Sequence, residues 1–320
     1  MINWETMDQL AKSRSHTCAL STAYARSRIK RSKIVDEDIA ERINVLADGL
    51  IETCPPSRSC EIMRSVADII KEESVMRIFT DEARMHLENP LYSTAAQVVE
   101  SDIVSGLVLH RHPLLRVTCA TTSSSPQMRL QAEDLSIDSS MAVGGYDSFV
   151  VFLQARECAI DLFEVDPSMD DRQILLPPVR KEMRTGDHLF LEGGKQGFVL
   201  ATPQCRVNMI LLARQLPRDP LSRLYDRKTR GLVRISSASV RDSRIQNLAT
   251  ALARLEGTRN GDALEQLTHH DSYFVRWHAV RELCSMDETR AYARLKKMAH
   301  GDPHEEIRSL SRQLTANEGE

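Results

Sequence analysis

The middle of the chain, about residues 103–216, contains a series of short β-rich runs. Aliphatic and aromatic residues dominate each run, and glycine, proline, serine or aspartate separates it from the next. The residues between the runs show no helical spacing, so the strands are expected to form an antiparallel sandwich or barrel. The runs are Leu107–Leu109, Leu114–Thr118, Phe149–Leu153, Ala159–Val165, His188–Leu191, Gly197–Leu200 and Val207–Leu212.

Helical patterns flank this block. Apolar residues recur every three or four positions between Ile39 and Leu50, which predicts an amphipathic helix. The pair Pro55-Pro56 ends this helix, because proline lacks an N–H group and restricts its predecessor. A second helix is expected after Ser59 and a third over Val75–Leu87.

Length and composition fit an ordinary globular protein of two or three domains. Of the 320 residues, 42% are apolar and 27% are charged, which excludes a disordered or fibrous chain. The expected division is an N-terminal helical region over 1–102, a β-domain over 103–216, and a connecting segment with further helices over 217–320. The net charge of −3 gives no global electrostatic argument for binding nucleic acid or an acidic membrane.

Cysteine usage and the start of the chain indicate a reducing compartment. The seven cysteines are spread over the whole length, unlike the dense pattern of a secreted disulfide scaffold. Residues 1–5 do not begin a signal peptide, and no apolar run approaches the roughly 18–20 residues that span a bilayer. We therefore expect a cytoplasmic protein without a membrane segment.

The C-terminal part contains an internal similarity. Leu264 and Leu295 are 31 residues apart, as are Asp271 and Asp302, and Arg276 precedes Arg308 by 32. The segment 262–314 thus resembles a pair of HEAT-type helical hairpins.

This resemblance implies that the turn aspartate caps the second helix of each hairpin and that the arginine reaches an aspartate of the neighbouring repeat. It also implies a surface for a partner, with Arg276, Trp277 and Arg308 as candidate contact residues. Trp277 is expected to pack between the repeat and whatever part of the chain precedes it. The alternative is that these helices only cover the β-domain.

A second resemblance lies in the β-block. Residues 180–194 contain the turn Gly186-Asp187, a short apolar strand and Gly193-Gly194. This order resembles a step of the cupin-type double-stranded β-helix, and the likeness extends over about 107–214. Cyclic-nucleotide-binding domains share the topology, but their Gly-Glu and phosphate-binding arginine are missing after Gly193-Gly194.

The cupin resemblance implies a metal site that this sequence does not complete. The family places His-x-His and a following Glu on one hairpin and a third His on a later strand, which together hold iron or manganese. Residues 140–154 contain no histidine, and no glutamate follows His110 and His112 at the family distance. His188 lies at the Gly-Asp turn rather than at the third-ligand position. We therefore assign no metal, cofactor or catalytic residue, and keep these three histidines as the alternative ligand set.

A basic segment near the N-terminus is the remaining candidate. Residues 12–33 contain seven lysines and arginines and no acidic residue, a composition that can neutralise phosphates. No helix-turn-helix spacing follows, so a solvated face or a contact between subunits is favoured over nucleic acid.

The sequence thus predicts a multi-domain α+β protein with N-terminal helices, a cupin-like antiparallel β-barrel and HEAT-like C-terminal hairpins. The favoured function is a non-enzymatic binding, scaffold or ligand-sensing protein that contacts another protein or a second copy, with a small ligand in the barrel. One alternative is a metal-dependent cupin-type enzyme of the oxygenase or isomerase class. Another is a nucleic-acid-associated regulator that uses the basic N-terminal segment.

Overall fold

A computed structural model of the chain divides into two units. The first comprises Met1–Asp219 and Arg223–Arg234, and the second comprises Pro220–Ser222 and Ile235–Glu320. The basic segment 12–33 lies outside the described residues, which are 35–88, 97–100, 104–122, 140–156, 158–166, 174–201, 206–255 and 260–316.

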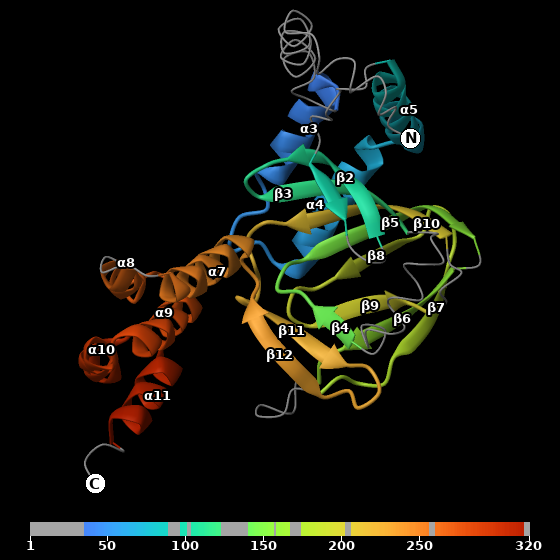
Figure 1. Ribbon diagram of the computed structural model, residues 1–320. Coiled ribbons are helices and arrows are strands. Elements are labelled where there is room, and N and C mark those ends of the chain that lie inside the picture. The colour runs from blue at the N-terminus through green and yellow to red at the C-terminus, as the bar shows by residue number, and fades with distance from the viewer. Residues whose placement is uncertain are drawn as a thin grey trace, which may run out of the picture. The chain divides into compact units, whose positions relative to one another are not determined.

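A six-stranded antiparallel sheet organises the first unit, with the order β1-β2-β3-β10-β5-β8 (Figure 1). Strand β10 occupies an inner position, where Ile210 pairs with Cys119 of β3 on one side and with Val151 of β5 on the other. The strands are β1 (Val98–Glu100), β2 (Val104–Arg111), β3 (Leu115–Thr122), β5 (Ser148–Arg156), β8 (His188–Leu191) and β10 (Arg206–Arg214).

Two three-stranded sheets complete the described β-structure, with the orders β7-β6-β9 and β12-β11-β4. The strands predicted from sequence are present, but the described strands form three separate sheets rather than the predicted closed barrel. The strands of the smaller sheets are β4 (Ser140–Val143), β6 (Cys158–Glu164), β7 (Val179–Met183), β9 (Gln196–Leu200), β11 (Leu221–Asp226) and β12 (Leu232–Ser237).

The six-stranded sheet is buried on both faces, which the alternation of side chains along β10 shows. Ile210 and Leu212 belong to a core shared with the N-terminal helices, on what we call the helix face. Val207 and Met209 belong to a core shared with Ile160 and other residues of the β7-β6-β9 sheet, on what we call the sandwich face. A run that is apolar at consecutive positions is what a strand covered on both sides requires.

Three helices pack on the helix face, as the spacing of apolar residues predicted. Ile43 and Met63 are fully buried in the same core as Leu115 and Phe149 of the sheet. The helices and the sheet therefore form one unit, and the boundary expected near residue 102 does not separate two cores. The helices are α3 (Glu37–Ala47), α4 (Pro56–Ile69) and α5 (Glu72–Glu88).

The second unit is built from helices around a core of its own, in which Leu264, Val280 and Leu283 are fully buried. The side chain of Ser239 caps the first of these helices by accepting a bond from Asp242 N at 3.2 Å. The expected aspartate cap of α9 is not formed, because Ser272 occupies that position and makes no side-chain cap. The helices are α7 (Val240–Arg254), α8 (Asn260–Leu267), α9 (Tyr273–Met286), α10 (Glu288–Gly301) and α11 (Glu305–Ala316).

None of the helices in the described ranges combines the length and the apolarity that a membrane crossing requires.

Candidate functional site

The two histidines of the His-x-His pair contact helix α3 and the residue that directly follows it. His110, on β2, lies 2.8 Å from Asn44, measured from Nε2 to Oδ1. His112 Nε2 lies 3.2 Å from a carboxylate oxygen of Asp48, and its Nδ1 accepts a bond from the N–H of Leu114 at 3.2 Å. Each histidine ring thus contacts a polar side chain, Asn44 or Asp48, in or directly after α3.

His188 is also on the helix face. Its ring stacks on Phe149, with ring centroids 5.3 Å apart, and its Nε2 is 3.2 Å from Nη2 of Arg64 on α4. Because a guanidinium group can only donate, this ring nitrogen accepts and the proton is on Nδ1. Phe149 belongs to the core beneath the helices. The His188 ring that stacks on it therefore lies on the helix face and not on the sandwich face.

These placements do not fit the metal centre that the cupin resemblance implies. The three histidines contact groups of the N-terminal helical part, whereas the sandwich face of the sheet carries Val150, Phe152, Val207 and Met209. In the described part of the chain, no group of three or more His, Cys, Asp or Glu side chains is arranged to hold a metal ion. His110, His112 and His188 therefore do not form the alternative ligand set.

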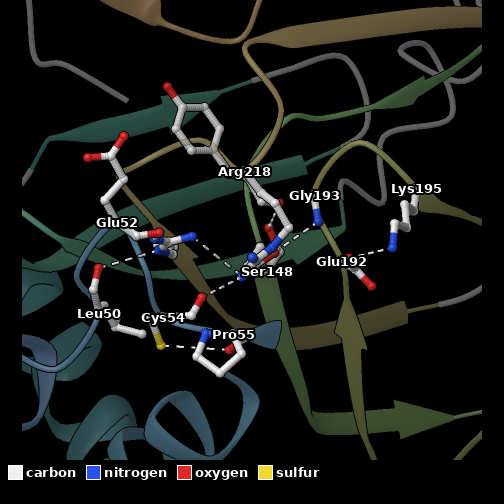
Figure 2. Close-up of polar contacts among 12 residues, drawn as sticks. Leu50, Glu52, Cys54, Pro55, Ser148, Glu192, Gly193, Lys195 and Arg218 are labelled. Carbon is white, nitrogen blue, oxygen red and sulfur yellow. Dashed lines mark hydrogen bonds and ion pairs between the residues drawn. The ribbon is translucent and has the colours of Figure 1, made fainter. Parts of the chain in front are cut away.

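A buried charge cluster lies instead where loops meet at one end of the sheet. Asp147, directly before β5, is completely buried. Its carboxylate accepts a bond from the N–H of Gly193 at 3.0 Å and from Nε of Arg218 at 2.8 Å, while Nη2 of Arg218 donates to its other oxygen (Figure 2). Nη2 of Arg218 also donates to the carbonyl of Cys54 at 3.2 Å. The cluster thus joins the sheet to the segment between α3 and α4.

Arg214, the last residue of β10, completes the cluster. Its side chain is 1% exposed, and its Nη1 is 3.8 Å from Asp147. Nη2 donates to the carbonyls of Ile51 and Glu52, at 2.6 and 3.1 Å. These two carbonyls lie in the segment between α3 and α4, so Arg214 also joins this segment to the sheet.

The charge states follow from these contacts. Burial alone would raise the pKa of Asp147, but the hydrogen bonds from Arg218 and Gly193 outweigh it, and the pKa lies below its ordinary value. The hydrogen bond to Asp147 raises the pKa of Arg218. Asp147 is therefore an ionised group that orients Arg218, and it is not suited to act as a general base.

A glycine pair shapes this end of the sheet. A Cβ atom on Gly193 would lie 2.4 Å from the carbonyl oxygen of Gly145, and Gly194 has a φ of +80°. Only glycine permits this close approach, which brings the Gly193 N–H to Asp147. The turn Gly193-Gly194 was visible in the sequence as a cupin-like step. Gly144-Gly145 connects β4 of one sheet to β5 of another.

The candidate partner residues of the second unit have different environments. Arg276 is 6% exposed and makes a two-bond ion pair with Asp302, at 2.8 and 2.6 Å, so the predicted arginine–aspartate contact between hairpins is present. Arg308 donates to the carbonyls of Asp302 and Pro303, at 2.7 and 3.1 Å. Trp277 is partly buried and packs against the core of its unit, as expected.

The sequence and the structure were compared with known proteins. No family model matches the sequence. No curated protein matches it either.

Some of the solved structures that match are described as cupins, with low identity and low TM-scores. An RmlC-like cupin from Shewanella frigidimarina has 8% identity and a TM-score of 0.25, covering 37% of this chain and 83% of its own. The DMSP lyase DddQ from Ruegeria pomeroyi has 12% identity and a TM-score of 0.24, covering 37% and 56%. A candidate mannose-6-phosphate isomerase from Ralstonia eutropha has 12% identity and a TM-score of 0.22, and the match covers 36% of this chain and 88% of that one.

This comparison corrects the predicted function. The sequence favoured a non-enzymatic scaffold or ligand sensor, whereas the titles of the similar structures name a lyase and a candidate isomerase. The prediction of a scaffold was therefore wrong, and the alternative of a cupin-type enzyme agrees better with these neighbours. The cupin-like part of the predicted fold is supported.

Proposed function

We propose that the protein is a cupin-type enzyme that acts on a small molecule with a carboxylate or phosphate group, and that Arg218 binds this group. The observation that carries the proposal is that other groups fix the guanidinium of Arg218 while one of its nitrogens stays outside these bonds. Its guanidinium is fixed by Asp147 and by the carbonyl of Cys54, its side chain is 21% exposed, and Nη1 takes part in none of these bonds.

A fixed guanidinium suits anion recognition for two reasons. Its planar donors match the oxygens of carboxylates and phosphates, and a side chain that is already ordered loses less entropy on binding. Asp147 is shielded from water, so solvent does not compete for the bonds that hold Arg218. The loops around Arg218 end strands of a rigid sheet, which is where binding residues commonly lie.

The proposal assigns no step to a metal ion, because the described histidines do not form the family's ligand set. It assigns Arg218 to substrate recognition and Asp147 to positioning. The histidines contribute to the packing of α3 and α4 on the sheet.

The test compares wild type with Arg218→Gln and Arg218→Lys. Each protein is incubated with a panel of small carboxylic acids and sugar phosphates, and conversion is followed by proton and phosphorus NMR. We expect conversion of at least one compound by wild type, and a loss on the order of tenfold or more in both variants, since lysine lacks the two-donor geometry.

Arg180→Gln is the matched control, because Arg180 is exposed and pairs with Asp161 at the surface of β6. This variant should retain full activity. Circular dichroism verifies that Arg218→Gln is folded. Equal activity of wild type and folded Arg218→Gln on every converted compound would contradict the role of Arg218, and no conversion of any compound would contradict the enzymatic function.

We also propose that the hairpins of 262–314 are of the HEAT type. The ion pair between Arg276 and Asp302 supports this assignment, because it joins the second helix of one hairpin to the turn of the next.

A further inference from the structure

We infer that the second unit has a binding site for a phosphate-bearing small molecule, in a groove between the turns of its two hairpins. The groove encloses about 610 Å³, within the range of ligand pockets. It belongs to a different unit from Arg218 and does not depend on the function proposed above. The residues of the groove used in the argument are His269, Tyr273, Arg294, Lys297, Gly301 and His304.

The charges of the groove favour an anion. Arg276 and Asp302 also line it, but they neutralise each other in their ion pair. Arg294 is held by the hydroxyl and the carbonyl of Thr268, at 2.7 and 2.9 Å, and lies 3.3 Å from Nδ1 of His269. Among the residues that the structure describes, no carboxylate bonds to it. Lys297 is exposed and has no hydrogen-bond or ion-pair partner within the described ranges.

Of the two carboxylates that line the groove, Asp302 is paired with Arg276, and Asp271 is exposed. Arg294 and Lys297 therefore outnumber the lining carboxylate that is left, within the described residues. An ordered arginine next to a mobile lysine is a combination typical of phosphate binding, in which arginine supplies directed donors and lysine a point charge.

The helix ends that meet at the groove add to this potential. Helix α9 begins at Tyr273 and helix α11 at Glu305, so both N-termini lie beside the turns that line it. Free N–H groups and the positive end of a helix dipole attract anions.

His304 and Tyr273 form an aromatic part of the groove lining. The two rings stack with centroids 3.8 Å apart, which gives the groove a flat face beside its cations.

The experiment measures binding of inorganic phosphate and pyrophosphate to the full chain by isothermal titration calorimetry, with citrate as the carboxylate probe. Gly301→Glu tests the groove directly, because a Cβ on Gly301 meets no atom within 4 Å and the helix tolerates glutamate. Lys297→Gln tests the charge. Lys296→Gln is the matched control, since Lys296 lies over the ring of Tyr292 at 4.6 Å and does not line the groove.

We expect saturable binding of pyrophosphate to wild type, weakened about tenfold or more by Gly301→Glu and by Lys297→Gln and unchanged by Lys296→Gln. Arg218→Gln should also leave it unchanged, which separates this site from the one proposed in the first unit. Absence of saturable binding, or equal weakening by Lys296→Gln and Lys297→Gln, would overturn the inference. Tighter binding of citrate than of pyrophosphate would overturn the assignment to phosphate.

Discussion

Nε2 of His110 lies 2.8 Å from the side-chain oxygen of Asn44, and this bond ties strand β2 to helix α3. Because a carbonyl oxygen only accepts, the ring carries its proton on Nε2. A residue with the spacing of a metal ligand is therefore a contact between a sheet and the helix that covers it.

Stability should depend on pH through His110. Burial, with a smaller effect of His112, lowers the pKa of His110 below its ordinary value of 6.5. The unfolded chain then binds the proton more readily, so stability is full above the unfolded pKa and falls as pH decreases below it. In His110→Gln, which keeps a donor toward Asn44, we expect a smaller drop in melting temperature between pH 7 and 5 than in wild type. His300→Gln, at an exposed position, should follow wild type, and a His110→Gln profile identical to wild type would refute the assignment.

Metal content should not depend on the His-x-His pair. We expect the double variant His110→Ala, His112→Ala to melt at a lower temperature, because it loses the contacts to Asn44 and Asp48. Iron, manganese, nickel and zinc per chain, measured by mass spectrometry of protein purified without chelators, should be the same as in wild type. A stoichiometric metal present in wild type and lost in the variant would show that these histidines are ligands.

Removing the charge of Asp147 should destabilise the first unit strongly. Asp147→Asn leaves Arg214 and Arg218 without their counter-ion in a buried site, which typically costs about 3–5 kcal/mol. Asp36→Asn breaks an exposed pair with Arg77 and should cost less than about 1 kcal/mol. Urea unfolding measures both.

The same variant, Asp147→Asn, should also change how the free energy of unfolding falls at low pH. The lowered pKa of Asp147 means that its contribution is present above the ordinary value of 3.8 and is lost as pH falls through the folded-state pKa. As pH falls below 3.8, Asp147→Asn should therefore lose less free energy of unfolding than wild type. The same loss in both proteins would argue against an ionised Asp147.

The ion pair of the second unit allows a parallel test. Asp302→Asn leaves the buried Arg276 without its counter-ion, and we expect a loss of about 3–5 kcal/mol. Asp262→Asn, in an exposed pair with Arg290, should change the free energy of unfolding by less than about 1 kcal/mol. Equal effects in chemical unfolding would mean that burial of the pair does not determine its contribution.

Trp277 should matter for packing rather than for charge. The ring is partly buried against the helical core, so Trp277→Ala should cost about 2 kcal/mol, less than the 3–5 kcal/mol of a fully buried aromatic ring. Thermal unfolding measures this, and an unchanged melting temperature would place the ring outside the core.

The sequence predicted the elements with a clear apolar pattern. In α3 apolar residues recur every three or four positions, and β5 contains a continuous apolar run. It did not predict β7, in which four of five residues are exposed, or β11, whose Arg223 interrupts the alternation. The cluster of Asp147 and Arg218 was missed for another reason. These residues are 71 positions apart, and one sequence does not show which distant charges meet.

The position of β10 has a consequence for synthesis on the ribosome. Helices α3–α5 emerge early, but β10 supplies inner residues of the sheet that covers them and is translated much later. Until then the nascent chain exposes apolar helix faces and the free edges of β3 and β5, which are surfaces that molecular chaperones bind. Expression of this protein is therefore expected to respond to chaperone supply and to translation speed before residue 206.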